Sequence, residues 1–315
     1  MAHVTFIHGI SNKPPKEDLL RIWRDALAEG DCALPLGDYG VTSDMVYWAD
    51  VLYESPDLDI SAYESLEGLT AESVDAGGGP DFPDAATDEE RQFLTALRSR
   101  FTSLNDLEIE SLPATTLVQP EGIGLERVPL PWPLKKLILR AFLRDVHHYL
   151  FDTVHSPRPG VSYQVRKEIR RRFVEGLKSP TVTSPHIVVA HSLGTVIAYD
   201  CLKNLLNDCP RVDGFITLGS PLGIDEVQDR LTPGWTRNDG YPYQKDAGGW
   251  TNVCDPLDPV CGFDAEIANE FLVGGTEKIQ DQMVVNGGNW RHSAVKYLRR
   301  PDVRCQLRAM LNLPC

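Results

Sequence analysis

The chain has 315 residues, a hydrophobic content of 42% and a formal net charge of 31 − 45 = −14. This composition is typical of a globular protein with a sizeable core, and the acidic charge argues against a nucleic-acid partner, because phosphate binding requires a basic surface. No stretch approaches the roughly 18 consecutive apolar residues of a membrane-spanning helix, and the first residues lack the pattern of a signal peptide, so we expect a cytoplasmic protein.

The seven cysteines are odd in number and scattered, which is not the pattern of a disulfide framework. Cys254 and Cys261 are close enough in sequence to pair, but in a reducing compartment we expect free thiols. The chain contains no C-x-x-C pair, phosphate loop or dinucleotide-binding fingerprint. We therefore expect no metal, no cofactor and no structural disulfide.

The chain begins with an alternating pattern. We predict a buried strand over residues 3–8, an amphipathic helix over 16–29 and a second strand over 44–53. The alternation of apolar and polar residues then ends. Residues 54–110 contain 15 acidic and 3 basic residues around a glycine- and proline-rich centre. We predict that this stretch is an acidic, mobile arm.

An amphipathic segment follows at residues 131–155, where apolar side chains such as Leu137 and Phe142 recur at helical spacing among lysines and arginines. We predict a helical cap whose apolar face lines a pocket above the active site. A basic amphipathic helix can also lie on a membrane surface, but the acidic charge of the whole chain disfavours this alternative. A further helix is predicted over 163–178.

Regular alternation returns after residue 184. Strands are predicted over 186–191, 212–218, 250–254 and 281–285, and helices over 194–206 and 293–311, the last with a break near Pro301. Strands that alternate with helices predict an α/β fold, with a mostly parallel sheet of about six strands and helices on both faces. We assign residues 1–53 and 161–315 to this core, and residues 54–160 to a large helical and irregular insertion.

The stretch HIVVAHSLGTVIAYD, residues 186–200, places Ser192 between a predicted buried strand and a predicted helix. A sharp strand-to-helix turn of this kind presents a nucleophile in a strained backbone conformation. The residues two before and two after the nucleophile must be small, and Ala190 and Gly194 meet that need. The stretch is therefore typical of a nucleophile elbow.

A serine hydroxyl needs a histidine to accept its proton and an acid to orient that histidine. His292 is the only histidine after His191, and Asp255 and Asp258 follow the predicted strand 250–254. We prefer Asp258 as the acid, because three further residues let the loop reach over the sheet edge. Asp255 is the alternative, and it would otherwise bond loop amides.

The remaining requirement is an oxyanion hole, a pair of backbone N–H groups aimed at the developing negative charge. One is expected from Leu193, the residue after the nucleophile. The other is expected from Ile10 in the loop after the first strand, where Gly9 lets the chain turn tightly. Together these residues predict a serine hydrolase with Ser192, Asp258 and His292 as its catalytic triad.

The segments FIHGI, VVAHSLGT, TLGSPLG, NVCDPLDPV and RHSAVKYL, in this order, resemble the α/β-hydrolase superfamily. They are most similar to its lipase and esterase branch, which includes the GPI inositol deacylases and the fungal lipases. The resemblance implies that the two usual first edge strands are missing. It also implies cleavage of a carboxylic ester, with a lipid-like ester as one option. Peptidases, amidases and thioesterases use the same triad and are alternatives, and a non-catalytic scaffold is a further one.

Overall fold

The computed structural model of the chain describes residues 2–59, 85–103, 132–179, 181–231, 234–246, 248–287 and 290–314. Its centre is a six-stranded sheet with the strand order β2-β1-β5-β6-β7-β8, in which each neighbouring pair is parallel. The strands are β1 (His3–Ile7), β2 (Thr42–Val46), β5 (His186–His191), β6 (Gly214–Leu218), β7 (Trp250–Cys254) and β8 (Gln280–Met283). The predicted α/β fold with a parallel six-stranded sheet is confirmed.

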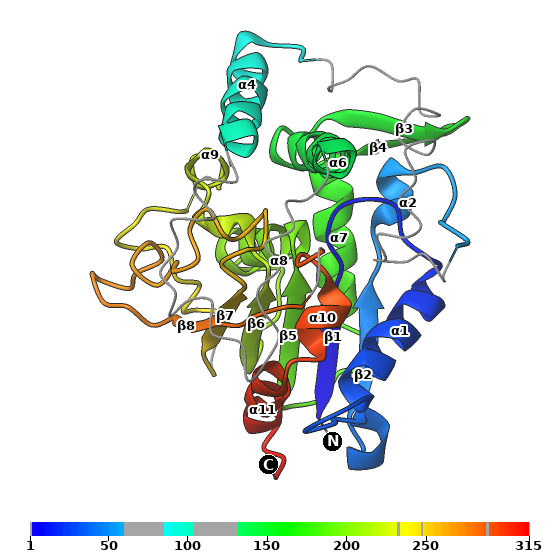
Figure 1. Cartoon of the computed structure of the whole chain (residues 1–315), viewed down its shortest axis with the longest axis vertical. Coiled ribbons are helices and arrows are strands. Elements are labelled where there is room, and N and C mark those ends of the chain that lie inside the picture. The colour runs from blue at the N-terminus through cyan, green and yellow to red at the C-terminus, as the bar shows by residue number, and fades with distance from the viewer. Residues whose placement is uncertain are drawn as a thin grey trace.

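Helices cover both faces of the sheet, as Figure 1 shows. One face carries α1 (Lys16–Ala28), α10 (Ala294–Leu298) and α11 (Pro301–Met310), and the other carries α7 (Val165–Leu177) and α8 (Leu193–Asn204). Shorter elements are α2 (Ala49–Leu52), α9 (Asp225–Gln228) and the 3-10 helices η1 (Leu36–Tyr39) and η3 (Pro221–Gly223). The predicted break near Pro301 is confirmed, since α11 begins at this proline, whose missing N–H costs nothing in a first turn.

Alternate residues along a strand enter two separate cores. In β5, Ile187 and Val189 belong to the core under α1, α10 and α11, whereas Val188 and Ala190 belong to the core under α7 and α8. All six residues of β5 are buried, as expected for a central strand of a parallel sheet whose two faces are both covered.

Two predicted elements differ from the structure. Only the first part of the segment 44–53, predicted as a strand, is a strand in the structure. Strand β2 ends at Val46, and Ala49–Leu52 forms α2. The chain turns there because the backbone N–H of Trp48 donates to His8 Nε2 at 3.0 Å, a contact from a distant loop. The helix predicted over 163–178 begins at Val165, because a hairpin of β3 (Val154–Arg158) and β4 (Val161–Gln164) precedes it.

The prediction of an irregular acidic arm is wrong for Asp88–Ser103, which forms helix α4. Thr87 and Glu90 cap its start: the Glu90 N–H donates to the Thr87 hydroxyl at 3.2 Å, and that hydroxyl donates to Glu90 Oε1 at 3.1 Å. Three side chains of α4, those of Phe93, Leu94 and Leu97, are buried in the core beside α6. The rest of the predicted arm, apart from residues 54–59 and 85–87, lies outside the described residues.

Helix α6 (Trp132–Leu150) forms within the predicted cap. In Figure 1 it lies beyond the end of the sheet toward which the strands point, with α4 outside it. The Ser11 N–H in the loop after β1 donates to Asp145 Oδ2 at 2.8 Å, and the buried Phe142 and Val146 share a core cluster with Ile10 and Leu193. Helix α6 therefore packs beside the loops at the carboxyl edge of the sheet.

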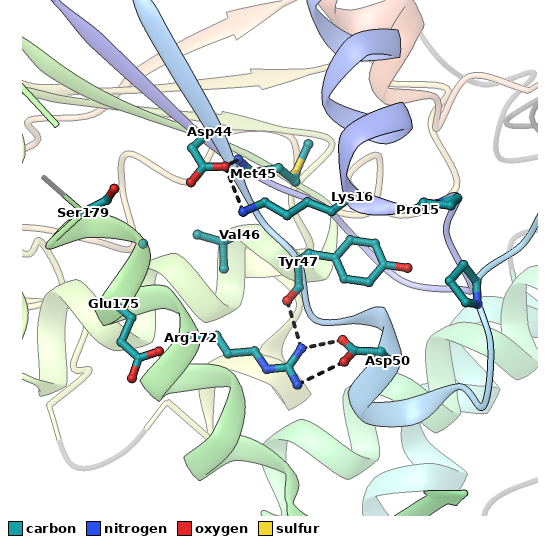
Figure 2. Close-up of a pocket in the computed structure, with 12 residues that line it drawn as sticks. Pro15, Lys16, Asp44, Met45, Val46, Tyr47, Asp50, Arg172, Glu175 and Ser179 are labelled. Carbon is teal, nitrogen blue, oxygen red and sulfur yellow. Dashed lines mark hydrogen bonds and ion pairs between the residues drawn. The ribbon is translucent and has the colours of Figure 1, made fainter. Parts of the chain in front are cut away.

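A cavity of about 740 Å³ lies elsewhere, along the outer side of β2 and against α7 (Figure 2). Four of its charged groups are paired with each other: Arg172 binds Asp50, and Lys16 lies 2.9 Å from Asp44. Ser192 and His292 are not among its lining residues. The cavity is therefore separate from the predicted catalytic residues.

Candidate functional site

Ser192 lies between the end of β5 and the start of α8. Its backbone has φ 54° and ψ −132°, a conformation that only glycine adopts without strain. Gly194 packs so closely under this turn that a Cβ on it would stand 2.5 Å from the carbonyl oxygen of His8. The buried Ala190 lies in the central strand beside Ile7 and Thr217. The turn thus has the strained conformation and close packing expected of a nucleophile elbow.

The predicted oxyanion loop follows β1 and is held by His8. The ring nitrogen Nε2 accepts the Trp48 N–H, so Nδ1 carries the hydrogen, and this group donates to the Gly9 carbonyl oxygen at 2.9 Å. Burial, and then the charge of Lys13, lowers the pKa of His8 well below its usual value, which keeps the ring neutral. In a trans peptide the N–H opposes the carbonyl, so the Ile10 N–H points away from His8.

Leu193, the other predicted donor, is the first residue of α8. The first N–H groups of a helix have no partner within the helix, and the helix dipole adds partial positive charge there. An N–H group at this position is suited to stabilise an anionic oxygen next to Ser192.

His292 and Asp258 lie against each other, although 34 residues separate them. His292 Nδ1 is 2.9 Å from Asp258 Oδ1 and 2.8 Å from Oδ2, and both side chains are buried. The Val260 N–H donates to Oδ1 at 2.8 Å, and the Tyr297 hydroxyl donates to Oδ2 at 2.8 Å. Since an imidazole that donates from Nδ1 presents Nε2 as an acceptor, His292 has the tautomer that a general base requires.

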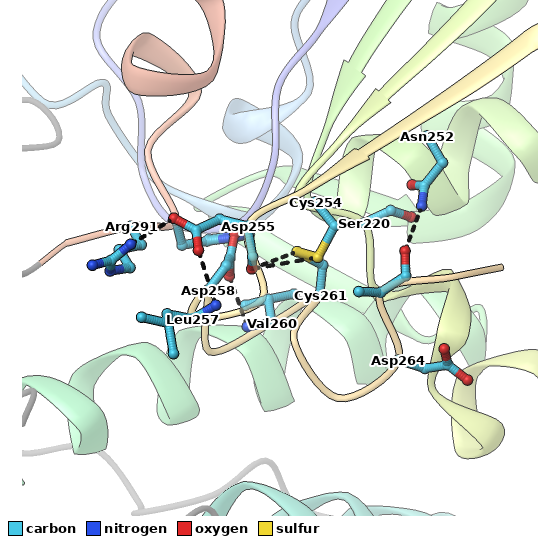
Figure 3. Close-up of a disulfide and its surroundings, with 12 residues drawn as sticks. Ser220, Asn252, Cys254, Asp255, Leu257, Asp258, Val260, Cys261, Asp264 and Arg291 are labelled. Carbon is cyan, nitrogen blue, oxygen red and sulfur yellow. Dashed lines mark hydrogen bonds and ion pairs between the residues drawn. A yellow bond between two sulfur atoms is a disulfide. The ribbon is translucent and has the colours of Figure 1, made fainter. Parts of the chain in front are cut away.

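Asp255 has a different environment, although it lies on the same loop (Figure 3). Its carboxylate accepts the Leu257 N–H at 2.9 Å and the Asn286 N–H at 2.7 Å, and it pairs with Arg291 at 3.0 Å. Burial raises its pKa, against the opposing effect of Arg291. Asp255 therefore ties the loop after β7 to the loop before His292, and within the described residues its carboxylate makes no hydrogen bond to the His292 imidazole.

A disulfide joins Cys254 to Cys261, so the prediction of free thiols at these positions is wrong. The loop after β7 brings the two Cα atoms within 6.0 Å, a separation that a disulfide spans readily. The bridge flanks the segment that carries Asp255 and Asp258 (Figure 3). Among the described cysteines, Cys32, Cys201 and Cys209 are free.

The serine hydroxyl and the base have unused hydrogen-bonding capacity. Ser192 Oγ and His292 Nε2 are both buried and make no hydrogen bond to the described residues. Ser192 is 0% exposed, so its hydroxyl is closed to solvent in this conformation. Catalytic hydrogen bonds often form fully only when substrate is bound, so the unbonded pair is compatible with a catalytic role.

Sequence reasoning gave no individual role to three residues that surround the His292–Asp258 pair. These are Tyr297, His191, whose ring centroid lies 4.7 Å from that of His292, and Gly219. A Cβ on Gly219 would stand 2.9 Å from Asp258 Oδ2, and its φ of 56° favours glycine. Gly219 had a detectable signal, since it directly follows a predicted strand.

Within the described ranges, no group of three or more His, Cys, Asp or Glu residues is arranged to hold a metal ion. In the same part of the chain, every helix is too short or too polar to cross a bilayer.

Comparisons with known proteins identify no family for the chain. No protein-family model matches the chain, and no curated protein matches it. Among solved structures, the chain is similar to an uncharacterized protein from Pseudomonas aeruginosa, with 9% sequence identity and a TM-score of 0.26 over 82% of this chain. The match covers 35% of that protein, so the chain spans about a third of its length. A likeness of this strength carries no argument about fold or function.

Proposed function

We propose that the chain is a serine hydrolase of the α/β-hydrolase type that cleaves a carboxylic ester, with Ser192 as nucleophile, His292 as base and Asp258 as acid. One observation carries the proposal. His292, oriented by Asp258, and a serine in a strained strand-to-helix turn lie at the carboxyl edge of one parallel sheet. Ligand sites of open α/β sheets are found at this edge.

The first half of the reaction forms an acyl-enzyme. Ser192 Oγ attacks the ester carbonyl carbon while His292 Nε2 takes the hydroxyl proton. Asp258 stabilises the resulting imidazolium through Nδ1–H. The N–H groups of Ile10 and Leu193 stabilise the carbonyl oxygen as it becomes negative. The C–O bond to the leaving alcohol then breaks, and the alcohol departs with the proton from Nε2.

The second half restores the enzyme. Water attacks the acyl carbon, His292 Nε2 accepts a proton from this water, and the carboxylic acid leaves as Oγ recovers its proton. The burial of Ser192, and the contact of the amphipathic helix α6 with Ser11 beside Ile10, support an apolar acyl group. A lipid-like ester is the substrate class that fits this environment.

The proposal is tested with a fluorophosphonate probe followed by peptide mass spectrometry. We expect the probe to label Ser192, and we expect the folded protein to hydrolyse p-nitrophenyl esters. The Ser192→Ala variant should lose both properties, whereas Ser179→Ala, which lies beside the separate cavity on β2 and α7, should keep them. A folded protein that is neither labelled nor active on esters, thioesters or amides would contradict the proposal.

A further inference from the structure

Tyr297 bridges two parts of the loop after β7. It lies on α10, five residues after His292, and its side chain is fully buried. Its hydroxyl oxygen lies 2.8 Å from Asp258 Oδ2 and 3.0 Å from the backbone nitrogen of Asp255. The short segment from His292 into α10 therefore contacts Asp258 twice, once through His292 and once through Tyr297.

The direction of each hydrogen bond follows from chemistry. The Asp255 N–H can only donate, so the hydroxyl oxygen accepts it, and the single hydroxyl hydrogen remains for the Asp258 carboxylate. Burial, followed by the charges of Asp258 and Asp255, raises the pKa of Tyr297 well above its usual value. Tyr297 therefore keeps its hydrogen at neutral pH.

The carboxylate of Asp258 is held on both oxygens. The Val260 N–H donates to Oδ1, Tyr297 donates to Oδ2, and His292 Nδ1 lies within hydrogen-bond distance of both oxygens. The Tyr297 ring also closes one side of the pair, since a Cβ on Gly219 would meet Tyr297 Cε2 at 3.1 Å. Without the hydroxyl, Oδ2 would keep only its contact with His292, and the carboxylate would gain freedom to rotate about its Cβ–Cγ bond.

We infer that Tyr297 is a positioning residue of the catalytic pair: its hydroxyl locks the Asp258 carboxylate in the orientation that holds the His292 imidazole toward Ser192. The consequence for turnover rests on the proposed function, but the effect on the His292 hydrogen bond does not. Tyr297 has no role in proton transfer, because its hydrogen stays on the phenol.

Tyr297→Phe removes the hydroxyl and keeps the ring. For p-nitrophenyl ester hydrolysis we expect kcat to fall roughly 10- to 100-fold, the range typical of a lost hydrogen bond to a charged group. KM should stay within about twofold, because the hydroxyl does not touch substrate. The low-field Nδ1–H proton resonance of His292, identified by its loss in His292→Gln, should broaden through faster exchange with water.

Tyr241→Phe is the matched control. Tyr241 is also buried and donates its hydroxyl to a buried carboxylate, that of Asp246, which bridges to Val212 at the amino ends of β6 and β7. Both variants should lose similar thermal stability, but Tyr241→Phe should keep kcat and the His292 resonance. An unchanged His292 resonance in Tyr297→Phe would overturn the inference, whether or not the protein hydrolyses esters. A wild-type protein without esterase activity, but with the expected change in the resonance, would refute only the proposed function.

Discussion

Gly9 lies directly against Ser192, from a loop 183 residues earlier in the chain. A Cβ built on Gly9 would stand 2.4 Å from Ser192 Cβ and 3.0 Å from Ser192 Oγ. The 2.4 Å separation is far below van der Waals contact, so only glycine fits without a shift of the backbone. The contact brings the loop after β1 to the proposed nucleophile, and it explains a glycine whose sequence signal, a position after a strand, is common.

We expect Gly9→Ala to be severe, because its methyl group meets the nucleophile itself. Overpacking of a rigid site typically costs about 1–3 kcal/mol, and here relief requires either Ser192 or the oxyanion loop to move. The loss of kcat, expressed as a free energy, should therefore exceed the loss in the free energy of unfolding. Steady-state kinetics and thermal unfolding of the purified variant measure the two effects.

Gly37→Ala is the control for Gly9→Ala, since a Cβ there meets only Arg24 Nη2 at an ordinary 3.5 Å. This variant should resemble wild type in both measurements. A Gly9→Ala protein with normal turnover would show that the loop after β1 takes no part in the reaction.

The two neighbouring aspartates should respond differently to the same change. Asp258→Asn presents an amide to His292 Nδ1 and favours the wrong imidazole tautomer, which costs on the order of 10⁴ in kcat in a triad. Asp255→Asn breaks contacts to Arg291 and to two backbone N–H groups, so it should reduce stability more and kcat less. Kinetics and urea unfolding of both variants make the comparison, and the opposite ranking of the kcat values would assign the acid to Asp255.

Reduction of the Cys254–Cys261 disulfide should destabilise the loop that carries both aspartates. Chain-entropy arguments give about 2–3 kcal/mol for so short a loop. Cys254→Ser and Cys261→Ser should lower the unfolding temperature alike, whereas Cys32→Ser, at an exposed free cysteine, should not. Intact-mass measurement after alkylation without reductant checks the bridge directly. Labelling of both thiols in the folded wild-type protein would contradict it.

The sequence was sufficient for the regular part of the fold because local signals agreed there with tertiary structure. The strands His186–His191 and Trp250–Cys254 have the predicted boundaries, since each is an apolar run set between turn signals. Prediction failed where a distant contact decides the backbone. Trp48 turns the chain because its N–H meets His8, and no pattern local to residues 44–53 contains that information.

The candidate site shows the same contrast between local sequence signals and contacts from distant residues. Ser192, Asp258 and His292 were identified from order and spacing, and the structure brings Asp258 and His292 together. Tyr297 was missed because a buried tyrosine in a helix is usually a core residue. Only the folding of α10 against the loop after β7 gives its hydroxyl a carboxylate partner.

Stability should fall on acidification through buried neutral histidines, and His186 gives a clear test. Burial, and then the neighbouring His3, lowers its pKa to about 4, against about 6.5 in an unfolded chain. Between these values the unfolded state binds a proton that the folded state refuses. The contribution of His186 to the free energy of unfolding is therefore fully present above pH 6.5. It is lost as the pH falls toward 4, at up to about 1.4 kcal/mol per pH unit.

His186→Gln should flatten this pH dependence, because glutamine can still contact Thr5 but does not titrate. Urea unfolding of wild type and variant between neutral and mildly acidic pH measures the slope. Thr5→Val removes the hydrogen bond and keeps the imidazole, so it should lower stability while preserving the slope. Equal slopes for His186→Gln and wild type would mean that His186 takes up its proton over the same pH range in the folded and unfolded states.

Helix α6 is the part of the insertion with the clearest connection to the site. Phe142 is fully buried, its ring lies 4.9 Å from that of Phe101 on α4, and Asp145, one turn later on α6, accepts the Ser11 N–H next to Ile10. The amides of Ile10 and Leu193 are the proposed contacts of the ester carbonyl oxygen. An acyl chain bound at that carbonyl would therefore lie near the apolar face of α6, as the proposed cap requires.

Phe142→Leu should lower kcat/KM for a p-nitrophenyl laurate about 4- to 15-fold, the equivalent of one or two buried methylene groups, and should leave the butyrate nearly unchanged. The short acyl chain ends before it reaches the cap, so it cannot register the lost contact. Phe173→Leu makes the same change at a fully buried phenylalanine on α7, which packs against β2 and α8. It should cost similar stability without altering the preference for chain length, because α7 packs against β2 and α8 and is not part of the proposed cap. An equal loss on both esters in Phe142→Leu would mean that α6 stabilises the fold without lining the acyl site.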